Sequence, residues 1–332
     1  MEIRIIIDVM GGDNPASELV KGAVLGAKEC GASLVLVGNR SEIEPALDGF
    51  DARIEDTDEV VHMVDDPMVS LRSKSNSSMS VGCRLIAAGE GDIFISCGNT
   101  GALYTASSHY IRCYSGVRRA ALGAVMPLSS PFVIADAGAN PEADAQSLLR
   151  FAKLGETYCR VALNIEAPRV ALINNGTEPY KGTKVIREAY ELLSASDMNF
   201  IGNCEGRELP LGGCDVAVCD GFTGNVAIKT IEGMGRFVTS GVKKIVKTNL
   251  KTKIGALLLQ KELKQFIGGL DDTAYGGAPL LGISKPVMKI HGNADCNTVR
   301  TAVIQACSLV RKCLAEKMEA GVASLGRVAL EK

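Results

Sequence analysis

Short apolar runs rich in β-branched residues recur along the chain. Each is followed by a turn of Gly, Asp or Asn and then by a helical pattern. This alternation constrains the fold most strongly, because continuous apolar strands separated by helices are typical of a mostly parallel α/β sheet covered on both faces. The predicted strands are Ile3–Ile7, Leu34–Val37, Ile93–Ser96, Phe132–Ala135, Val170–Ile173 and Val216–Val218, and the predicted crossover helices include Ser17–Glu29, Pro141–Leu163 and Lys184–Ala195.

Crossover connections in such a sheet are right-handed, so we expect every Gly-rich loop to lie on one edge, outside the carboxyl ends of the strands. Ligands bind at that edge in open α/β folds. The chain has 36 Gly among 332 residues, about 11% against a usual figure of about 7%, and many follow predicted strands. No low-complexity linker divides the chain, which predicts a single α/β domain over residues 1–332.

Composition and motifs exclude several classes of function. The 36 Lys and Arg are balanced by 38 Asp and Glu, which excludes a general nucleic-acid binder. The chain lacks Trp and has only 5% aromatic residues, which argues against stacking platforms for single strands. It contains no P-loop, GxGxxG, GxSxG or HExxH motif, which weakens the P-loop NTPase, dinucleotide-binding and serine-hydrolase interpretations.

The cysteines point to a compartment rather than to a metal site. The 11 Cys include no CxxC pair and no zinc-finger spacing, and most lie in apolar segments such as the one that ends at Cys97. Reduced thiols buried as small hydrophobes explain them best, which predicts a cytoplasmic protein without a metal. The first residues predict a strand rather than a signal peptide, and no run of about 18 apolar residues predicts a membrane span.

Two loops share the pattern Gly-x-Thr-Gly. Gly98-Asn-Thr-Gly101 and Gly221-Phe-Thr-Gly224 each follow a strand that ends in Cys, and each opens a predicted helix. Backbone N–H groups at a helix N-terminus attract an oxyanion, although Gly also serves merely to permit a tight turn. The candidate phosphate- or oxyanion-binding residues are Asp8, Gly11, Gly12, Asp13, Gly98, Asn99, Thr100, Gly101, Asn140, Gly176, Gly182, Asp220, Gly221, Thr223 and Gly224.

Individual charged side chains add candidates at the same loops. His291 stands beside Gly292 at the end of an apolar run, a position suited to proton transfer or to phosphate binding. Lys181 lies on a loop after another strand and is suited to pairing with phosphate as a point charge. Asp8 and Asp220 follow strands and either orient donors or cap helices. Each of these side chains also has an ordinary structural explanation.

A basic amphipathic segment covers about residues 229–267. Nine basic residues between Lys229 and Lys264 face only Glu232 and Glu262, whereas the whole chain has a formal charge of −2. Apolar residues recur between the charges at helical spacing, which predicts one or two basic amphipathic helices.

Several uncommon motifs occur together in one order along nearly the whole chain. The most specific are Asp8-Val-Met-Gly-Gly-Asp13, Gly98-Asn-Thr-Gly-Ala-Leu103, Asp136-Ala-Gly-Ala-Asn-Pro141, Phe200-Ile-Gly-Asn-Cys-Glu-Gly206 and Asp220-Gly-Phe-Thr-Gly-Asn-Val226, followed by Leu280-Leu-Gly282 and His291-Gly292. With these motifs the chain resembles the bacterial phosphate acyltransferases of phospholipid synthesis. It departs from them at Asn293-Ala294, where the family usually has Ser-Ser, and in smaller ways at Val9 and Ala120.

The resemblance implies a Rossmann-like α/β/α sandwich akin to phosphotransacetylase and the isocitrate dehydrogenase group. It implies transfer of a fatty acyl group from acyl-acyl carrier protein to inorganic phosphate, without an organic cofactor. Phosphate itself attacks the thioester, so the protein need only position it and stabilise an oxyanion. On this basis we expect Lys181 to orient phosphate or steady the oxyanion, Asn225 to donate to the same centre, and His291 to protonate the leaving thiolate.

The resemblance also implies partners: a homodimer, the acidic acyl carrier protein, and the inner face of the plasma membrane or the next membrane acyltransferase. No nucleic-acid partner is expected. The docking candidates in the basic segment are Lys243, Lys244, Lys247, Lys251, Lys253, Leu257 and Leu258, although packing within a dimer is an alternative for the same helices. The alternative activities are a short-chain phosphotransacetylase that uses coenzyme A and a non-catalytic anion-binding or membrane scaffold. A dehydrogenase of the isocitrate type is weaker, since no acidic trio has obvious metal spacing.

Overall fold

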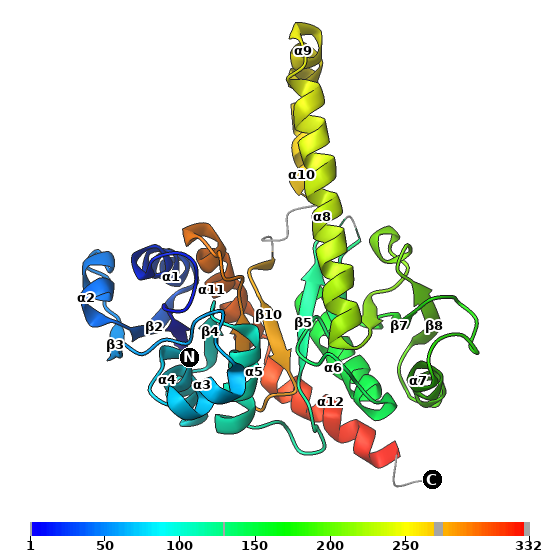
Figure 1. Ribbon diagram of the computed structural model, residues 1–332, viewed down its shortest axis with the longest axis horizontal. Helices are drawn as coiled ribbons and strands as arrows, with labels where there is room; N and C mark the ends of the chain where they lie inside the picture. The colour runs from blue at the N-terminus through cyan, green and yellow to red at the C-terminus, as the bar shows by residue number, and fades with distance from the viewer. Residues whose placement is uncertain (1, 129, 269–274, 329–332) are drawn as a thin grey trace.

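Eleven strands of the described residues form one sheet, in the order β3-β2-β1-β4-β11-β10-β5-β6-β9-β7-β8 (Figure 1). The computed structural model describes residues 2–128, 130–268 and 275–328. The strands are β1 (Ile3–Asp8), β2 (Ala32–Gly38), β3 (Arg53–Asp56), β4 (Ile93–Ser96), β5 (Ala121–Met126), β6 (Phe132–Ala135), β7 (Val170–Asn174), β8 (Phe200–Glu205), β9 (Val216–Val218), β10 (Ala278–Leu281) and β11 (Val287–Lys289). Every strand predicted from an apolar run is present.

Strand direction reverses in the middle of the sheet. β1, β2, β3, β4 and β11 run parallel, and β6, β7, β8 and β9 run parallel to one another in the opposite direction. The reversal arises because β10 pairs antiparallel with β11 and β5, and β5 pairs antiparallel with β6. The prediction of a mostly parallel α/β sheet is therefore confirmed. The prediction that all Gly-rich loops lie on one edge is wrong.

The register nevertheless brings the two sets of loops toward one place. Lys289, which ends β11, pairs with both Ser96 at the end of β4 and Ala278 at the start of β10. Ala135 at the end of β6 pairs with Gly123 of β5. Leu122, the residue of β5 that precedes Gly123, pairs with Leu280 of β10. The carboxyl ends of both sets of strands thus converge on β10 and β5.

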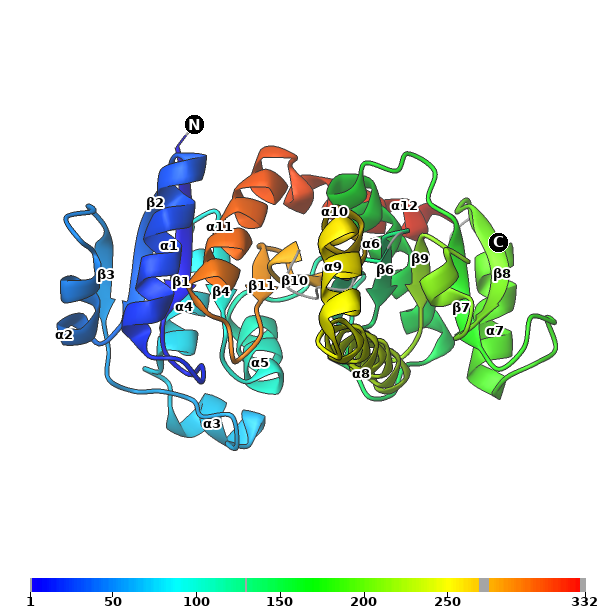
Figure 2. The same cartoon turned by 90° about the horizontal axis from the view of Figure 1, so that it is seen from above.

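Helices cover both faces of the sheet, as two separate hydrophobic clusters show (Figure 2). Successive residues of β1 alternate between the clusters: Ile5 and Ile7 belong to one and Ile6 to the other. The first cluster includes residues of α1 (Ala16–Cys30), α2 (Arg40–Ile43), α6 (Ala145–Leu163), α7 (Lys184–Ser194), α11 (Cys296–Arg311) and α12 (Leu314–Val328). The second includes residues of α4 (Ser78–Ala87), α5 (Thr100–Tyr110) and α8 (Gly221–Val246), and Leu71 of α3 (Pro67–Ser73) packs against it.

α8 extends far beyond the body of the molecule (Figure 1). α9 (Leu250–Leu258) lies at its far end, and α10 (Gln260–Gly268) contacts α9 and leads back toward the body. We call residues 229–268 of these helices the projection. The side chains of Lys264, Gln265 and Ile267 lie outside the described residues. In the part of the chain that the structure describes, no helix is both long enough and apolar enough to cross a membrane.

Candidate functional site

A cavity of about 310 Å³ lies where the two sets of loops converge, against the base of α8. We call it the central cavity. This volume is at the lower end of the range for small-molecule sites. Its lining comprises Thr100, Leu122, Ala124, Val125, Met126, Pro127, Ala137, Gly138, Asn225, Ile228, Lys229, Glu232, Tyr275, Gly276, Gly277, Ala278, Lys289, Ile290 and His291.

The lining combines an apolar surface with a few polar groups. β5 and α8 contribute the apolar side chains, among them Leu122, Val125 and Ile228. α8 also contributes three polar side chains, those of Asn225, Lys229 and Glu232. The others come from the ends of other elements: Thr100 opens α5, and Lys289 and His291 lie at and just after the end of β11. Such a lining suits a ligand with an apolar part and an anionic part.

A row of polar side chains crosses the ends of β1, β4 and β11. Asp8 pairs with Ser96, and Ser96 pairs with Lys289, so the three residues share one register line. The Ser96 hydroxyl donates to Asp8 Oδ2 at 2.7 Å and accepts the N–H of Gly98 at 3.1 Å. Burial raises the pKa of Asp8 from 3.8 to about 6, although Ser78 and Ser96 oppose the shift by hydrogen bonding.

Lys289 is a buried cation in the wall of the central cavity. Only 9% of its surface is exposed, and its Nζ donates to the carbonyl oxygen of Cys97 at 3.2 Å and to that of Ile290. Burial is the main cause that lowers the pKa of Lys289 from 10.5 to about 8, against the opposing charges of Asp8 and Asp13. Sequence reasoning missed this residue because Val287-Met288-Lys289-Ile290 simply reads as an apolar strand interrupted by one charge.

The loops after β1, β4 and β11 pack on one another beside this cavity. The N–H of Asp13 donates to Gly292 O at 2.7 Å. A Cβ at Gly12 would lie 2.7 Å from Cys97 Sγ, and one at Gly11 3.2 Å from Val61 O. The predicted residues of these loops are thus brought together, and Gly permits their close packing.

Asn99 and Asp220 cap the two helices that open at the Gly-x-Thr-Gly loops. Asn99 accepts from the N–H of Ala102 at 3.0 Å, and Asp220 accepts from Thr223 N–H at 2.7 Å. Gly221 N–H donates to Asn140 O at 2.7 Å. Several predicted backbone donors are therefore engaged within the protein, while the N–H groups of the first helical turn have no partner inside their own helix.

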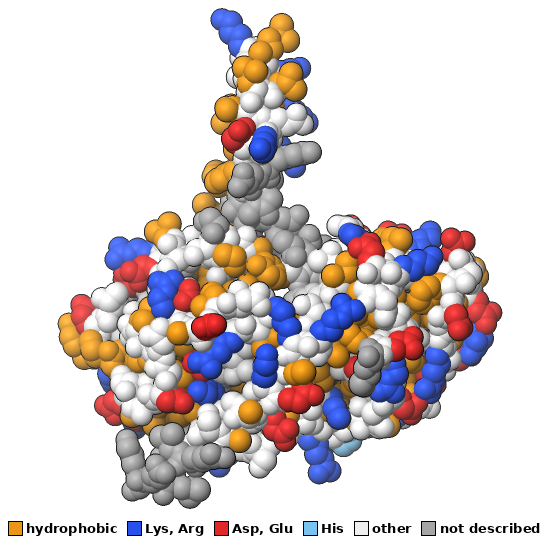
Figure 3. Space-filling model, turned by 180° about the vertical axis from the view of Figure 1, so that it is seen from behind, with side chains coloured by type: hydrophobic (Ala, Val, Ile, Leu, Met, Phe, Trp, Pro, Cys, Tyr) orange, Lys and Arg blue, Asp and Glu red, His pale blue; other side chains and the backbone are white. Residues whose placement is uncertain are grey.

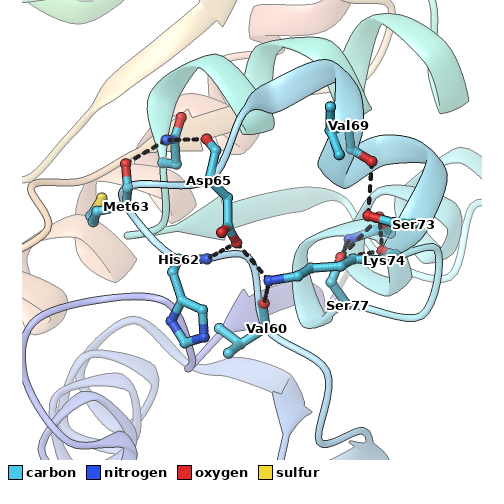
Figure 4. A network of polar contacts seen from close by, with 10 residues as sticks. Val60, His62, Met63, Asp65, Val69, Ser73, Lys74 and Ser77 are labelled. Carbon is cyan, nitrogen blue, oxygen red and sulfur yellow. Dashed lines mark hydrogen bonds and ion pairs between the residues drawn. The ribbon is translucent and has the colours of Figure 1, made fainter.

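The Asn99 side chain is also anchored to the segment that precedes α3. Its Nδ2 donates to Met63 O at 2.9 Å. Two residues further on, Asp65 accepts from Lys74 Nζ at 2.6 Å and from His62 N–H at 2.8 Å, and Lys74 also donates to Val60 O (Figure 4). Lys74 therefore holds this segment beside the Gly98–Gly101 loop.

The loop after β6 is built around a buried carboxylate. Asp136 has no exposed surface, and its Oδ1 accepts the N–H groups of Leu122, Gly138 and Ala139 at 2.9–3.0 Å. Its Oδ2 accepts both the backbone N–H and the side-chain Nδ2 of Asn140, each at 2.7 Å. The Asn140 side chain is thereby committed to the loop.

The same loop supports Asn225 of α8. A Cβ at Gly138, whose φ is +139°, would lie 3.5 Å from the Cβ of Asn225. A Cβ at Gly224 would lie only 1.9 Å from Asp136 O. Gly is therefore required where α8 crosses this loop, and Asn225 lines the cavity as a consequence.

Lys181 lies on a separate loop after β7, with Gly176 and Gly182. Its carbonyl oxygen accepts from Asn174 Nδ2 at 3.2 Å, and its Nζ lies 5.9 Å from the ring centroid of Tyr180. Thr100, Asn225 and His291 are among the described residues that line the central cavity, and Lys181 is not. The role of Lys181 stays a prediction.

The cysteines beside these loops are protonated thiols. Burial raises the pKa of Cys97 to about 12 and raises the pKa of Cys219 well above its ordinary value. A thiol with so high a pKa is a poor nucleophile at neutral pH. The arrangement thus favours direct attack by a bound substrate over a covalent intermediate on cysteine.

The projection exposes both charged and apolar side chains (Figure 3). Lys243, Lys244, Lys247, Lys251 and Lys253 are all exposed. So are Leu257 and Leu258 of α9, at 71% and 78%, and none of the α9 residues is buried. Large exposed apolar side chains gathered in this way indicate a surface that another molecule covers.

Comparisons with known proteins agree on one family. A family model described as "Fatty acid synthesis protein" matches residues 3–317. Curated proteins named phosphate acyltransferase match nearly end to end. That of Caldanaerobacter subterraneus subsp. tengcongensis is 40% identical over 311 residues, covering 93% of this chain and 94% of the relative. That of Thermotoga neapolitana is 42% identical over 323 residues, covering 96% and 97%.

Solved structures extend the likeness at the level of the fold. A phosphotransacetylase from Streptococcus pyogenes superposes with a TM-score of 0.63 at 17% identity, covering 93% of this chain and 94% of that one. A branched-chain phosphotransacylase from Enterococcus faecalis V583 gives 0.51 at 16% identity, covering 93% and 99%. The expected kinship with the phosphotransacetylase fold is confirmed.

Proposed function

The chain belongs to the fatty acid synthesis protein family and is an acyltransferase that acts on phosphate, and we propose that its acyl donor is a fatty acyl-acyl carrier protein. The product of the proposed reaction is acyl phosphate, which serves glycerolipid synthesis. The observation that carries this proposal is the central cavity, where an apolar surface from β5 and α8 meets the buried ammonium of Lys289. A fatty acyl chain would contact the apolar surface, and phosphate would pair with the ammonium.

The proposed reaction requires no protein nucleophile. A phosphate oxygen attacks the thioester carbonyl carbon, a C–O bond forms, and the C–S bond breaks as the tetrahedral oxyanion collapses. In this proposal Asn225 donates a hydrogen bond to the oxyanion, and His291 passes the proton of the attacking hydrogen phosphate to the departing thiolate. Both line the cavity that would hold the reacting groups.

Lys181 keeps its proposed role as the residue that orients phosphate or steadies the oxyanion. Its support is its place on a loop after β7, next to the strand that leads to α8. Lys181→Ala should lower acyl-phosphate production strongly in a folded protein. A variant with full activity would remove Lys181 from the mechanism.

The acyl donor is tested by measuring thiol release with palmitoyl-acyl carrier protein and with acetyl-coenzyme A. We expect release from the carrier protein only when phosphate is present, with a product that hydroxylamine traps as a hydroxamate. Preferred use of acetyl-coenzyme A would favour the alternative, a short-chain phosphotransacetylase. Absence of phosphate-dependent cleavage with either donor would leave only a non-catalytic scaffold.

We propose further that the projection docks on the anionic inner surface of the plasma membrane and on acyl carrier protein. Its exposed lysines suit both acidic surfaces, and Leu257 and Leu258 offer apolar contact to lipid. Leu257→Glu should abolish flotation with anionic liposomes, while Leu211→Glu, at an even more exposed leucine of the body, should not. Binding that survives Leu257→Glu would contradict the membrane role.

We also propose a homodimer in which residues 1–332 act as one domain and part of the projection packs against a second copy. Its support is the exposed apolar surface of α8, including Met234 and Phe237. Light scattering on Phe237→Glu should report a monomer, and on Leu257→Glu an intact dimer. An intact Leu257→Glu dimer is needed so that a loss of flotation in this variant reports lost membrane binding and not a lost dimer.

A further inference from the structure

Lys289 is a buried charge that has no carboxylate partner in the described part of the chain. Among the described residues its Nζ contacts two carbonyl oxygens, those of Cys97 and Ile290, and forms no ion pair. Asp8, the nearest acidic member of its row, stands two strands away, which is about 10 Å at the usual strand spacing. Asp8 is moreover occupied by the Ser96 hydroxyl and the N–H of Met10.

A buried cation of this kind is costly unless something compensates it. Carbonyl dipoles compensate in part, but an ammonium has three donors, and the contacts to described residues use two of them. The remaining donor belongs to a side chain that lines the central cavity. A small anion in the cavity would supply both the missing acceptor and the missing charge.

The neighbouring groups fit an oxyanion. Lys289 holds the carbonyl of Cys97, the residue that leads into Gly98-Asn99-Thr100, so its Nζ lies at the base of the loop that opens α5. Thr100, the first residue of α5, lines the same cavity. The free N–H groups and the dipole of a helix N-terminus favour an anion, and here a buried ammonium reinforces them.

We propose that Lys289 binds the attacking inorganic phosphate in the central cavity. This proposal rests on the proposed function, because phosphate is a substrate of that reaction. The group that the Lys289 ammonium binds is then phosphate and not the carbonyl oxygen of the thioester. Phosphate carries its full charge in the ground state, whereas a thioester oxygen gains charge only in the transition state. Loss of the ammonium should therefore raise KM for phosphate, whereas loss of an oxyanion contact would lower kcat.

The first experiment replaces the ammonium by an apolar chain of similar length. Lys289→Met should raise KM for phosphate by about tenfold or more, the scale of one lost charge-assisted hydrogen bond, with KM for palmitoyl-acyl carrier protein unchanged. Lys285→Met, at an exposed lysine just before the same strand, is the matched control and should behave as wild type. An unchanged KM for phosphate in folded Lys289→Met would overturn the proposal.

A second variant keeps the test decisive if Lys289→Met does not fold. Inorganic phosphate should stabilise the wild-type protein against heat, and the effect should weaken as pH rises through about 8, where Lys289 loses its proton. Lys289→Arg should fold and keep a phosphate effect that does not fade over this range, because guanidinium stays charged. An identical pH dependence in wild type and Lys289→Arg would refute the assignment.

Other titratable groups interact with Lys289, namely Asp8, Asp13, Cys97 and Lys229, and each is present in both proteins. Their titration therefore cancels in the comparison. The thermal readout uses phosphate alone and needs no acyl donor. Phosphate binding without thioester cleavage would thus contradict the proposed function but support Lys289 as a phosphate site. Thioester cleavage together with an unaltered phosphate response in Lys289→Met would support the proposed function and contradict the Lys289 site.

Discussion

Asp136→Asn is expected to be among the most damaging isosteric substitutions in this protein. The carboxylate accepts three backbone N–H groups on Oδ1 and two donors of Asn140 on Oδ2, all at 2.7–3.0 Å and all away from water. An Asn side chain presents one carbonyl oxygen and one NH₂ group, so in either orientation at least two native donors face another donor. Two lost bonds to a charged acceptor, at about 1.5–3 kcal/mol each, give about 3–6 kcal/mol of lost stability.

Urea denaturation of wild type and Asp136→Asn measures this loss as a change in the free energy of unfolding. Asp66→Asn is the matched control, because this exposed helix cap accepts the N–H groups of Met68 and Val69 on a single oxygen that Asn retains. Activity should fall together with stability, since the Asp136 loop supports Asn225 through Gly138. A loss below about 1 kcal/mol for Asp136→Asn would refute this account of the loop.

Three further outcomes follow from the same region. Gly224→Ala should destabilise the protein and lower kcat, because the new Cβ would lie 1.9 Å from Asp136 O; a fully active variant of wild-type stability would contradict this contact. Burial raises the pKa of Asp8 from 3.8 to about 6. Between these two pH values the folded state holds a proton that the unfolded state releases, so the free energy of unfolding should fall by about 3 kcal/mol as pH rises from 3.8 to about 6. Asp8→Asn should remove this part of the slope in urea titrations at several pH values, and an unchanged slope would show that Asp8 is not its source. Cys97→Ala should still form acyl phosphate, because a thiol whose pKa is about 12 is no nucleophile at neutral pH; complete loss of turnover in a folded variant would argue otherwise.

Local pattern was enough to predict six of the eleven strands of the described residues and the three named crossover helices, whereas β3, β5, β8, β10 and β11 were not predicted. Ile5, Ile6 and Ile7 form a continuous apolar run because the sheet is buried on both faces, and the structure assigns them alternately to the two hydrophobic clusters. The helix predicted from Pro141 begins instead at Ala145, because Asp144 caps it by accepting Ser147 N–H at 2.7 Å. Helix ends depend on such caps, and several nearby residues could have served.

Strand direction could not be read from the same pattern. An apolar run looks alike in a parallel and an antiparallel pair, and the inversion depends on β10 and β5, whose residues Ala278–Leu281 and Ala121–Met126 carry no hairpin signal between them. Contacts between residues more than 150 positions apart, such as Leu280 with Leu122, decide the direction. Sequence reasoning therefore identified the loops correctly but wrongly placed all of them on one edge of the sheet.

The same distance in sequence explains why the cation of the central cavity was missed. Asp8, Ser96 and Lys289 become neighbours only through the register of β1, β4 and β11, and none of the three stands in a shared motif. The glycines that looked like ligand donors have a second task here: Gly98 N–H is held by Ser96 and Gly221 N–H by Asn140, so that loops can pack tightly around the cavity. Tight packing excludes water, and exclusion of water strengthens a single buried ammonium as a site for phosphate. If Lys289 binds phosphate as proposed, the glycines supply the shape of the anion site and the one charge in an apolar strand supplies its charge.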